Sequence, residues 1–233
     1  MPAPTTDRWD LYDDTLPFAG AKYGPQRARM AAIGIGGGAL LIVSPGAPMS
    51  DAGWNELARL GTPRFLLAPN HFHNLGLAAW QARFPAATIV AHPRAQPRLR
   101  KKLPGLVVAD LAPLIAALPA GVRVFSPPMA KQGETFVSIA TQHGVAWFVT
   151  DALVNEERLP GAMGLFMRLM GFRTGLMTNP FFKRLFLSNK AAYKEWMHAE
   201  LERDRPTLFV PAHGAVLRGP DLVDRLRAAT DAA

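Results

Sequence analysis

The sequence contains no cysteine, and this absence removes two kinds of chemistry. Disulfide bonds are excluded, and so are thiolate ligands for a metal ion. Any metal site in this chain must therefore be built from nitrogen and oxygen ligands. The absence of cysteine also fits a reducing compartment, and we expect a cytoplasmic protein.

Long apolar runs are missing as well. Residues 1–10 have neither a basic start nor an apolar stretch of signal-peptide length. No uninterrupted apolar segment reaches the roughly 18 residues that a membrane-spanning helix needs. We therefore expect neither secretion nor a membrane span.

Acidic residues are scarce, with 18 Asp and Glu against 26 Lys and Arg and a net charge of +8. The segment from Arg158 to Lys194 has no acidic residue, and its seven cations alternate with Met, Phe and Leu. Such a segment favours acidic ligands or anionic membrane surfaces. The alternative is a pair of core-facing helices with a solvated basic face. The basic side chains from Arg98 to Lys102 are likewise explained by simple exposure to solvent. The sequence has no motif that would stack on nucleic-acid bases or read them in a groove.

Length and composition predict one domain over residues 1–233, because 233 residues with 49% hydrophobic content can bury a sizeable core. Residues 1–28 are predicted to be an irregular arm. Strands are predicted at 29–35, 39–44, 65–68, 88–91, 122–125, 135–140, 145–149 and 207–210, and helices at 51–60, 75–83 and 221–229. Glycines 36–38 join the first two strands as a hairpin turn.

Residues that bind metals follow three of the predicted strands. His71 and His73 come after the strand at 65–68, Asp151 follows the strand at 145–149, and His213 follows the strand at 207–210. Alternate side chains of an extended backbone point to the same face, so His71 and His73 can converge on one cation. We expect the three imidazoles and the carboxylate to surround a common cavity at one end of the sheets.

This order of motifs resembles that of the metallo-β-lactamase superfamily, in which a His-x-His-x-Asp-His loop, a later Asp and a final His-Gly each follow a strand. The resemblance implies a four-layer αβ/βα sandwich, with two facing sheets flanked by helices. Leu75 and Gly76 stand where the family has its loop Asp and third His, and the stretch 126–134 has no His where another ligand is usual. The resemblance therefore implies at most one divalent ion, Zn, Fe or Mn, held by His71, His73, Asp151 and His213.

The function that the resemblance implies is that of a metal-dependent hydrolase with a reduced site. A bound metal would lower the pKa of a water molecule toward about 7, and the resulting hydroxide can attack an ester, amide, thioester or phosphoester. Asp151 would be the catalytic residue that orients or deprotonates this water. With one ion only, activity on the ordinary substrates of the family should be slow or absent.

The alternative is a metal-free pseudoenzyme that keeps the pocket as a binding site for a small molecule. Lys131 lies in the turn that lacks the expected His, so its ammonium group could replace the metal and pair with Asp151; the competing interpretation is a solvated lysine. We further expect residues 158–194 to cover the pocket as a lid. Arg168 and Arg173, with Arg184, would bind the acidic group of an apolar ligand such as a fatty-acyl or aromatic carboxylate.

Overall fold

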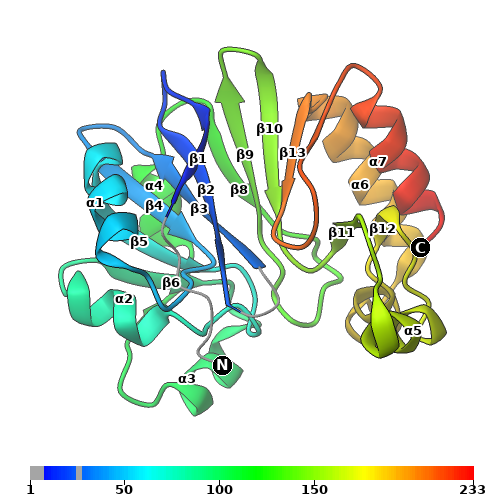
Figure 1. Ribbon diagram of the computed structural model, residues 1–233, viewed down its shortest axis with the longest axis horizontal. Helices are drawn as coiled ribbons and strands as arrows, with labels where there is room; N and C mark the ends of the chain where they lie inside the picture. Colours follow the sequence, from blue (N-terminus) through cyan, green and yellow to red (C-terminus); the bar gives the residue numbers. More distant parts are fainter. Residues whose placement is uncertain (1–7, 25–27) are drawn as a thin grey trace. The chain divides into compact units, whose positions relative to one another are not determined.

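The computed structural model describes residues 8–24 and 28–233, and these form two compact units that meet in sequence between Arg123 and Val124. Each unit is an α/β structure (Figure 1). The single domain expected for residues 1–233 stays a prediction. Among the described residues, no helix combines the length and the apolar character needed to cross a bilayer.

The first unit contains a seven-stranded sheet whose spatial order follows the chain. Its strands are β1 (Asp10–Asp13), β2 (Phe18–Tyr23), β3 (Ala28–Gly34), β4 (Ala39–Val43), β5 (Thr62–Ala68), β6 (Thr88–Ala91) and β7 (Val108–Ala109). The first four strands are antiparallel, whereas β4 to β7 are parallel. The parallel connections are made by α1 (Asp51–Leu60), α2 (Leu77–Arg83) and α3 (Gln96–Lys102), and α4 (Ala112–Ala117) follows β7.

The N-terminal region corrects the expectation of an irregular arm over residues 1–28. Residues 10–13 and 18–23 form β1 and β2, and β2 pairs along its whole length with β3. The sequence of β2 is rich in Ala and Gly, which have low β propensity, so pairing with β3 decides its conformation. Residues 1–7 and 25–27 of the expected arm lie outside the described part of the chain.

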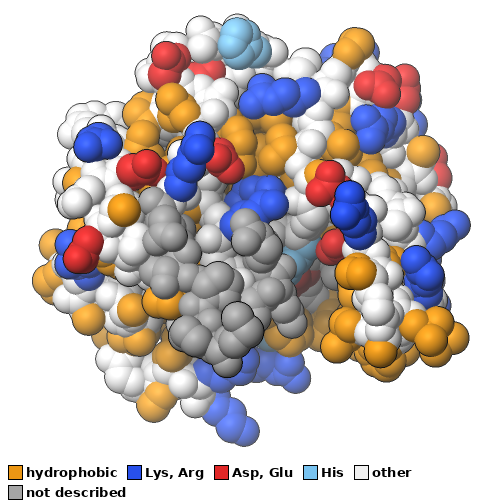
Figure 2. All heavy atoms as spheres, in the orientation of Figure 1, with side chains coloured by type: hydrophobic (Ala, Val, Ile, Leu, Met, Phe, Trp, Pro, Cys, Tyr) orange, Lys and Arg blue, Asp and Glu red, His pale blue; other side chains and the backbone are white. Residues whose placement is uncertain are grey.

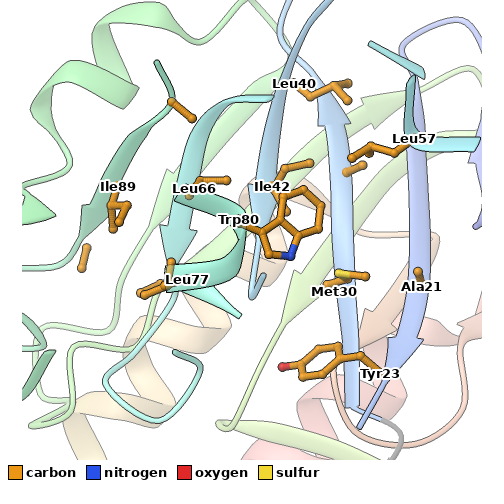
Figure 3. Packing of buried hydrophobic residues seen from close by; sticks show 14 of the residues in the cluster. Ala21, Tyr23, Met30, Leu40, Ile42, Leu57, Leu66, Leu77, Trp80 and Ile89 are labelled. Carbon is orange, nitrogen blue, oxygen red and sulfur yellow. The ribbon is translucent and has the colours of Figure 1, made fainter. Parts of the chain in front are cut away.

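The core of the first unit lies between the sheet and its helices (Figure 3). Trp80 of α2 is fully buried and packs edge-on against Trp54 of α1, and its indole Nε1 donates a hydrogen bond to the Gly46 carbonyl at 2.7 Å. Helix α1 begins as predicted, because the Ser50 side chain accepts a hydrogen bond from the Gly53 amide. The large aromatic side chain thus ties α2 to the loop that follows β4.

The second unit contains a five-stranded sheet in the order β14-β13-β10-β9-β8. Its strands are β8 (Val122–Phe125), β9 (Phe136–Thr141), β10 (Gly144–Val149), β13 (Leu208–Pro211) and β14 (Leu217–Arg218). Strands β10 and β13 are parallel, and the other pairs that involve them are antiparallel. Helices α6 (Lys190–Asp204) and α7 (Leu222–Asp231) pack Tyr193, Met197 and Leu226 against the aromatic residues of this sheet.

The acid-free segment has its own local structure. Strand β11 (Leu153–Glu156) precedes the segment and pairs with β12 (Gly175–Thr178) inside it, and α5 (Gly161–Leu169) lies between them in sequence. A short π-helix, η1 (Phe182–Phe186), follows. A small apolar cluster that includes Phe172 and Met177 holds these elements together. The segment is therefore not the pair of core-facing helices that composition alone allows.

Replacement of Trp80 by Ala should lower the free energy of unfolding by about 3–5 kcal/mol, because it opens a large cavity and removes the hydrogen bond to Gly46. Thermal and urea unfolding measure this loss. Val107→Ala is the control, since Val107 is 89% exposed and its truncation should change stability by less than roughly 0.5 kcal/mol. Equal effects of the two changes would contradict the central place of Trp80 in this core.

Candidate metal centre

The histidine loop after β5 is a turn held by two buried asparagines. The Asn70 carboxamide oxygen accepts hydrogen bonds from the amides of Phe72 and His73 at 2.8 and 3.3 Å, and the Asn74 amide group donates to the carbonyls of His71 and Phe72. Such side-chain turns fix short loops without regular structure. The alternation of an extended strand is therefore not what positions the two imidazoles.

His73 is oriented by hydroxyl groups through its Nδ1 atom. This atom lies 2.6 Å from the Ser44 Oγ and 3.4 Å from the Tyr23 hydroxyl, and these two oxygens are 2.8 Å apart. Ser44 directly follows β4, the parallel neighbour of β5, so both residues leave the sheet at the same edge. Hydroxyl contacts of this kind fix the ring of a metal-binding histidine and direct Nε2 to the metal.

His71 has a different partner. Its Nε2 atom lies 3.0 Å from Nη1 of Arg98, which comes from α3. A guanidinium group can only donate hydrogen bonds, so the lone pair of Nε2 accepts from Arg98 and the proton of the ring is on Nδ1. The same geometry places a permanent positive charge beside His71. The solvated basic cluster expected from Arg98 to Lys102 does not predict this contact.

Glu134 fixes the loop that follows β10, and sequence reasoning missed it too. Its carboxylate is fully buried and accepts hydrogen bonds from the Thr150 hydroxyl at 2.6 Å, the Asp151 amide at 2.8 Å and the Ala152 amide at 3.3 Å. The Gln132 side chain donates to its other oxygen at 3.1 Å. A buried carboxylate with this number of donors is held rigidly, and it sets the position from which Asp151 leaves the strand.

Asp151 and His213 are brought together by the parallel pairing of β10 and β13. Val149 lies opposite Pro211 in the ladder, and each ligand-type residue comes two residues further along. As a result, the Asp151 Oδ1 atom and the His213 Nε2 atom are 3.3 Å apart, and both side chains are largely buried. A carboxylate and an imidazole at this separation can share a metal ion or a proton.

The backbone geometry after His213 requires a glycine at position 214. The Asn155 amide donates to the His213 carbonyl at 3.1 Å, and the Ala215 amide donates to the Asn155 carbonyl at 2.8 Å. Gly214 passes between these bonds with φ +95°, and a Cβ atom there would clash with the Asn155 carbonyl oxygen. Only glycine combines this conformation with this close approach, so the glycine holds His213 against β11.

The position of the family's third histidine is closed by packing. Gly76 directly precedes α2 and lies beside the Pro45 carbonyl oxygen, which accepts its amide hydrogen at 3.1 Å, and a Cβ atom at this position would clash with that oxygen. Leu75, at the position of the family's Asp, is 75% exposed. Packing therefore excludes a side chain at position 76, and the side chain present at position 75 is a leucine, which cannot bind a metal.

The other residues singled out from the sequence are placed as follows. Lys131 is exposed, and its amide donates to the Phe186 carbonyl. Arg168 and Arg173 are also exposed, on α5 and before β12. His92 is partly buried after β6, and its pKa is lowered by burial and by the nearby Arg94 charge. The expected roles of Lys131, Arg168 and Arg173 in binding a ligand stay predictions.

Solved structures with the same architecture identify the fold. No family model and no curated protein matches the sequence. The chain is similar to the DIM-1 metallo-β-lactamase, with 11% identity, a TM-score of 0.59 and coverage of 99% of both chains. It is also similar to a metallo-β-lactamase from Erythrobacter litoralis, with 12% identity, a TM-score of 0.59 and coverage of 97% of this chain and 96% of that one.

The chain has the metallo-β-lactamase fold. A diflavin flavoprotein fragment from a Nostoc species is similar as well, with 12% identity, a TM-score of 0.57 and coverage of 99% of this chain and 96% of that one. The four-layer αβ/βα class expected from the sequence is thereby confirmed. In the first unit, His71 and His73 both follow β5. In the second unit, Asp151 and His213 follow the neighbouring strands β10 and β13 at the same edge of the sheet. The convergence of His73 with the Asp151–His213 pair stays a prediction.

Replacement of Gly76 by Ala should destabilise the protein by about 1–3 kcal/mol, since the new methyl group must displace the Pro45 backbone. A thermal unfolding scan measures the loss. Gly105→Ala is the matched control, because nothing lies within 4 Å of a Cβ atom built there. A stability of Gly76→Ala equal to that of the control would show that the loop can accept a side chain at the histidine position.

Proposed function

We propose that the protein is a metal-dependent hydrolase with a site for one divalent ion, and that the ligands are His73, Asp151 and His213. These three residues are of the types that can together hold a metal ion. The observation that carries the proposal is the Asp151–His213 pair, held 3.3 Å apart at the ends of two parallel strands. The metallo-β-lactamase fold, matched over nearly the whole chain, supports the convergence of this pair with His73.

The donor set fits a metal such as Zn, Fe or Mn. Two imidazoles and a carboxylate provide three ligands without sulfur, which is the usual protein contribution to a catalytic zinc site with one open position. His73 is already oriented through Nδ1 by Ser44 and Tyr23, as metal-binding histidines are. His71 is excluded from this set because Arg98 occupies its Nε2 atom and repels a cation.

When bound, the ion would supply the Lewis acidity that activates water for attack on an ester, amide, thioester or phosphoester bond. Asp151 would accept the proton of that water, because its carboxylate lies beside His213 and its backbone is fixed by Glu134. Glu134 acts through Asp151 and is a positioning residue. We propose an apolar molecule with an acidic group as the substrate.

A second candidate function is a metal-free protein that binds an anionic small molecule. The Arg98–His71 contact favours it, because a guanidinium group already provides positive charge at the first histidine of the motif. In this second candidate, Arg98 would supply the charge that the sequence analysis expects from Lys131, and both residues are exposed. The two candidates differ in one measurable property, which is the metal content of the purified protein.

Elemental analysis of protein purified without chelator, followed by zinc titration, should give at most one ion per chain. His73→Ala and His213→Ala should each reduce the bound metal to background, because they remove a ligand. His71→Ala should leave the stoichiometry unchanged, since Arg98 holds that imidazole outside the ligand set. His143→Ala is the matched control, because His143 is exposed in the β9–β10 turn.

Four results would contradict the proposal. Two ions per chain would show that further ligands exist, and metal retained by His73→Ala and His213→Ala would place the ion elsewhere. Loss of metal in His71→Ala would return His71 to the ligand set and show that Arg98 moves away. Absence of metal even in excess zinc would favour the metal-free binding protein, and isothermal titration with a fatty-acyl carboxylate would then test that function.

A further inference from the structure

Helix α5 is an apolar helix that buries almost nothing. Among its residues only Gly164 is buried, and this glycine packs against the Leu159 backbone. Met163, Leu165, Phe166 and Leu169 are 69%, 58%, 53% and 78% exposed. A surface helix normally turns its apolar side chains to the core, and this helix turns them to solvent.

These four side chains form one face, which we call the α5 face. Met163 and Phe166, Phe166 and Leu169, and Leu165 and Leu169 are three or four residues apart, so they are neighbours on one side of the helix. Leu185 of η1 is 58% exposed as well. Half of the large apolar side chains that are exposed in the described part of the chain thus belong to this short segment, and Figure 2 shows them gathered over α5.

Positive charge accompanies the α5 face. Arg184 donates a hydrogen bond to the Met170 carbonyl at 2.6 Å and so fixes a cation at the end of α5. Burial lowers the pKa of Lys183, and the nearby charges of Lys190, Arg184, Arg173 and Lys194 lower it further. Lys183 and Lys194 also donate hydrogen bonds to the Ala232 and Asp231 carbonyls at 3.1 and 2.7 Å, and the sequence has no Asp or Glu between Arg158 and Lys194. An anionic surface is the partner that this cluster fits.

We propose that the α5 face docks on an anionic lipid bilayer, with its apolar side chains inserted among the headgroups and the surrounding cations paired with lipid phosphates. Exposed apolar residues beside Lys and Arg, on a helix too short to span, are the features of an element that lies in the plane of the interface. A second copy of the chain is a poorer partner, since two such faces would bring like charges together. The proposal does not depend on the metal centre.

The absence of cysteine allows a direct test with a single introduced thiol. Leu165→Cys is labelled with an environment-sensitive dye and mixed with vesicles of phosphatidylcholine, alone or with phosphatidylglycerol. We expect a blue shift with the anionic vesicles only, reversed by about 1 M salt. Val107→Cys is the matched control, because Val107 is an exposed apolar residue of the first unit, and its dye should not shift.

Co-sedimentation with the same vesicles separates the apolar and electrostatic contributions. Leu165→Asp with Leu169→Asp, and Lys183→Glu with Arg184→Glu, should each reduce binding roughly tenfold or more. Ile115→Asp, at an exposed site outside the α5 face, should leave binding unchanged. Circular dichroism confirms that the variants are folded.

Four outcomes would overturn the proposal. Wild-type protein that stays in the supernatant with anionic vesicles does not dock on lipid. Equal dye shifts at positions 165 and 107 would indicate unspecific adsorption. A shift at position 165 that depends on protein concentration without vesicles would identify a second copy as the partner. Binding that is unchanged in both double variants would place the contact elsewhere.

Discussion

Parallel strand pairing is the constraint on which the candidate site depends. Parallel neighbours end at the same edge of a sheet, so residues just beyond them meet although they are far apart in sequence. In the second unit, the pairing of β10 with β13 brings Asp151 to His213 across more than sixty residues of chain. In the first unit, the pairing of β4 with β5 brings Ser44 to His73. Each half of the site thus follows from one ladder of backbone hydrogen bonds.

The loops at these edges are fixed by buried polar groups. Glu134 accepts hydrogen bonds from the Thr150, Asp151 and Ala152 positions, and Asn70 fixes the turn that carries His73. A buried carboxylate is costly unless it is fully hydrogen-bonded, so the donors around Glu134 leave it one conformation. This rigidity is useful to a site in which a proton or a metal ligand must stay within a fraction of an ångström of its place.

The sequence predicts elements that have a clear apolar pattern and ligand-type residues that follow such strands. It does not predict features whose conformation depends on contacts with distant parts of the chain. Each predicted strand and helix is present, and the fold class is confirmed, because buried parallel strands have recognisable apolar runs. Strand β2 was missed because its Ala and Gly residues become a strand only by pairing with β3. Arg98 and Glu134 were missed because no local pattern reveals that a guanidinium will reach His71 or that a carboxylate will hold a strand end.

The residues around the histidine loop fit a motif that lacks some of the family's metal ligands. At position 76 the Pro45 carbonyl leaves no room for a histidine, so one ligand of a second ion is excluded by packing. At position 71 the imidazole is present, but Arg98 uses its lone pair. Arg98 is an exposed residue, so solvent weakens its repulsion of a nearby cation, but its hydrogen bond still occupies the Nε2 lone pair. The first two imidazoles of the motif thus differ, because Nε2 of His71 is engaged by Arg98 whereas His73 is engaged through Nδ1 by Ser44.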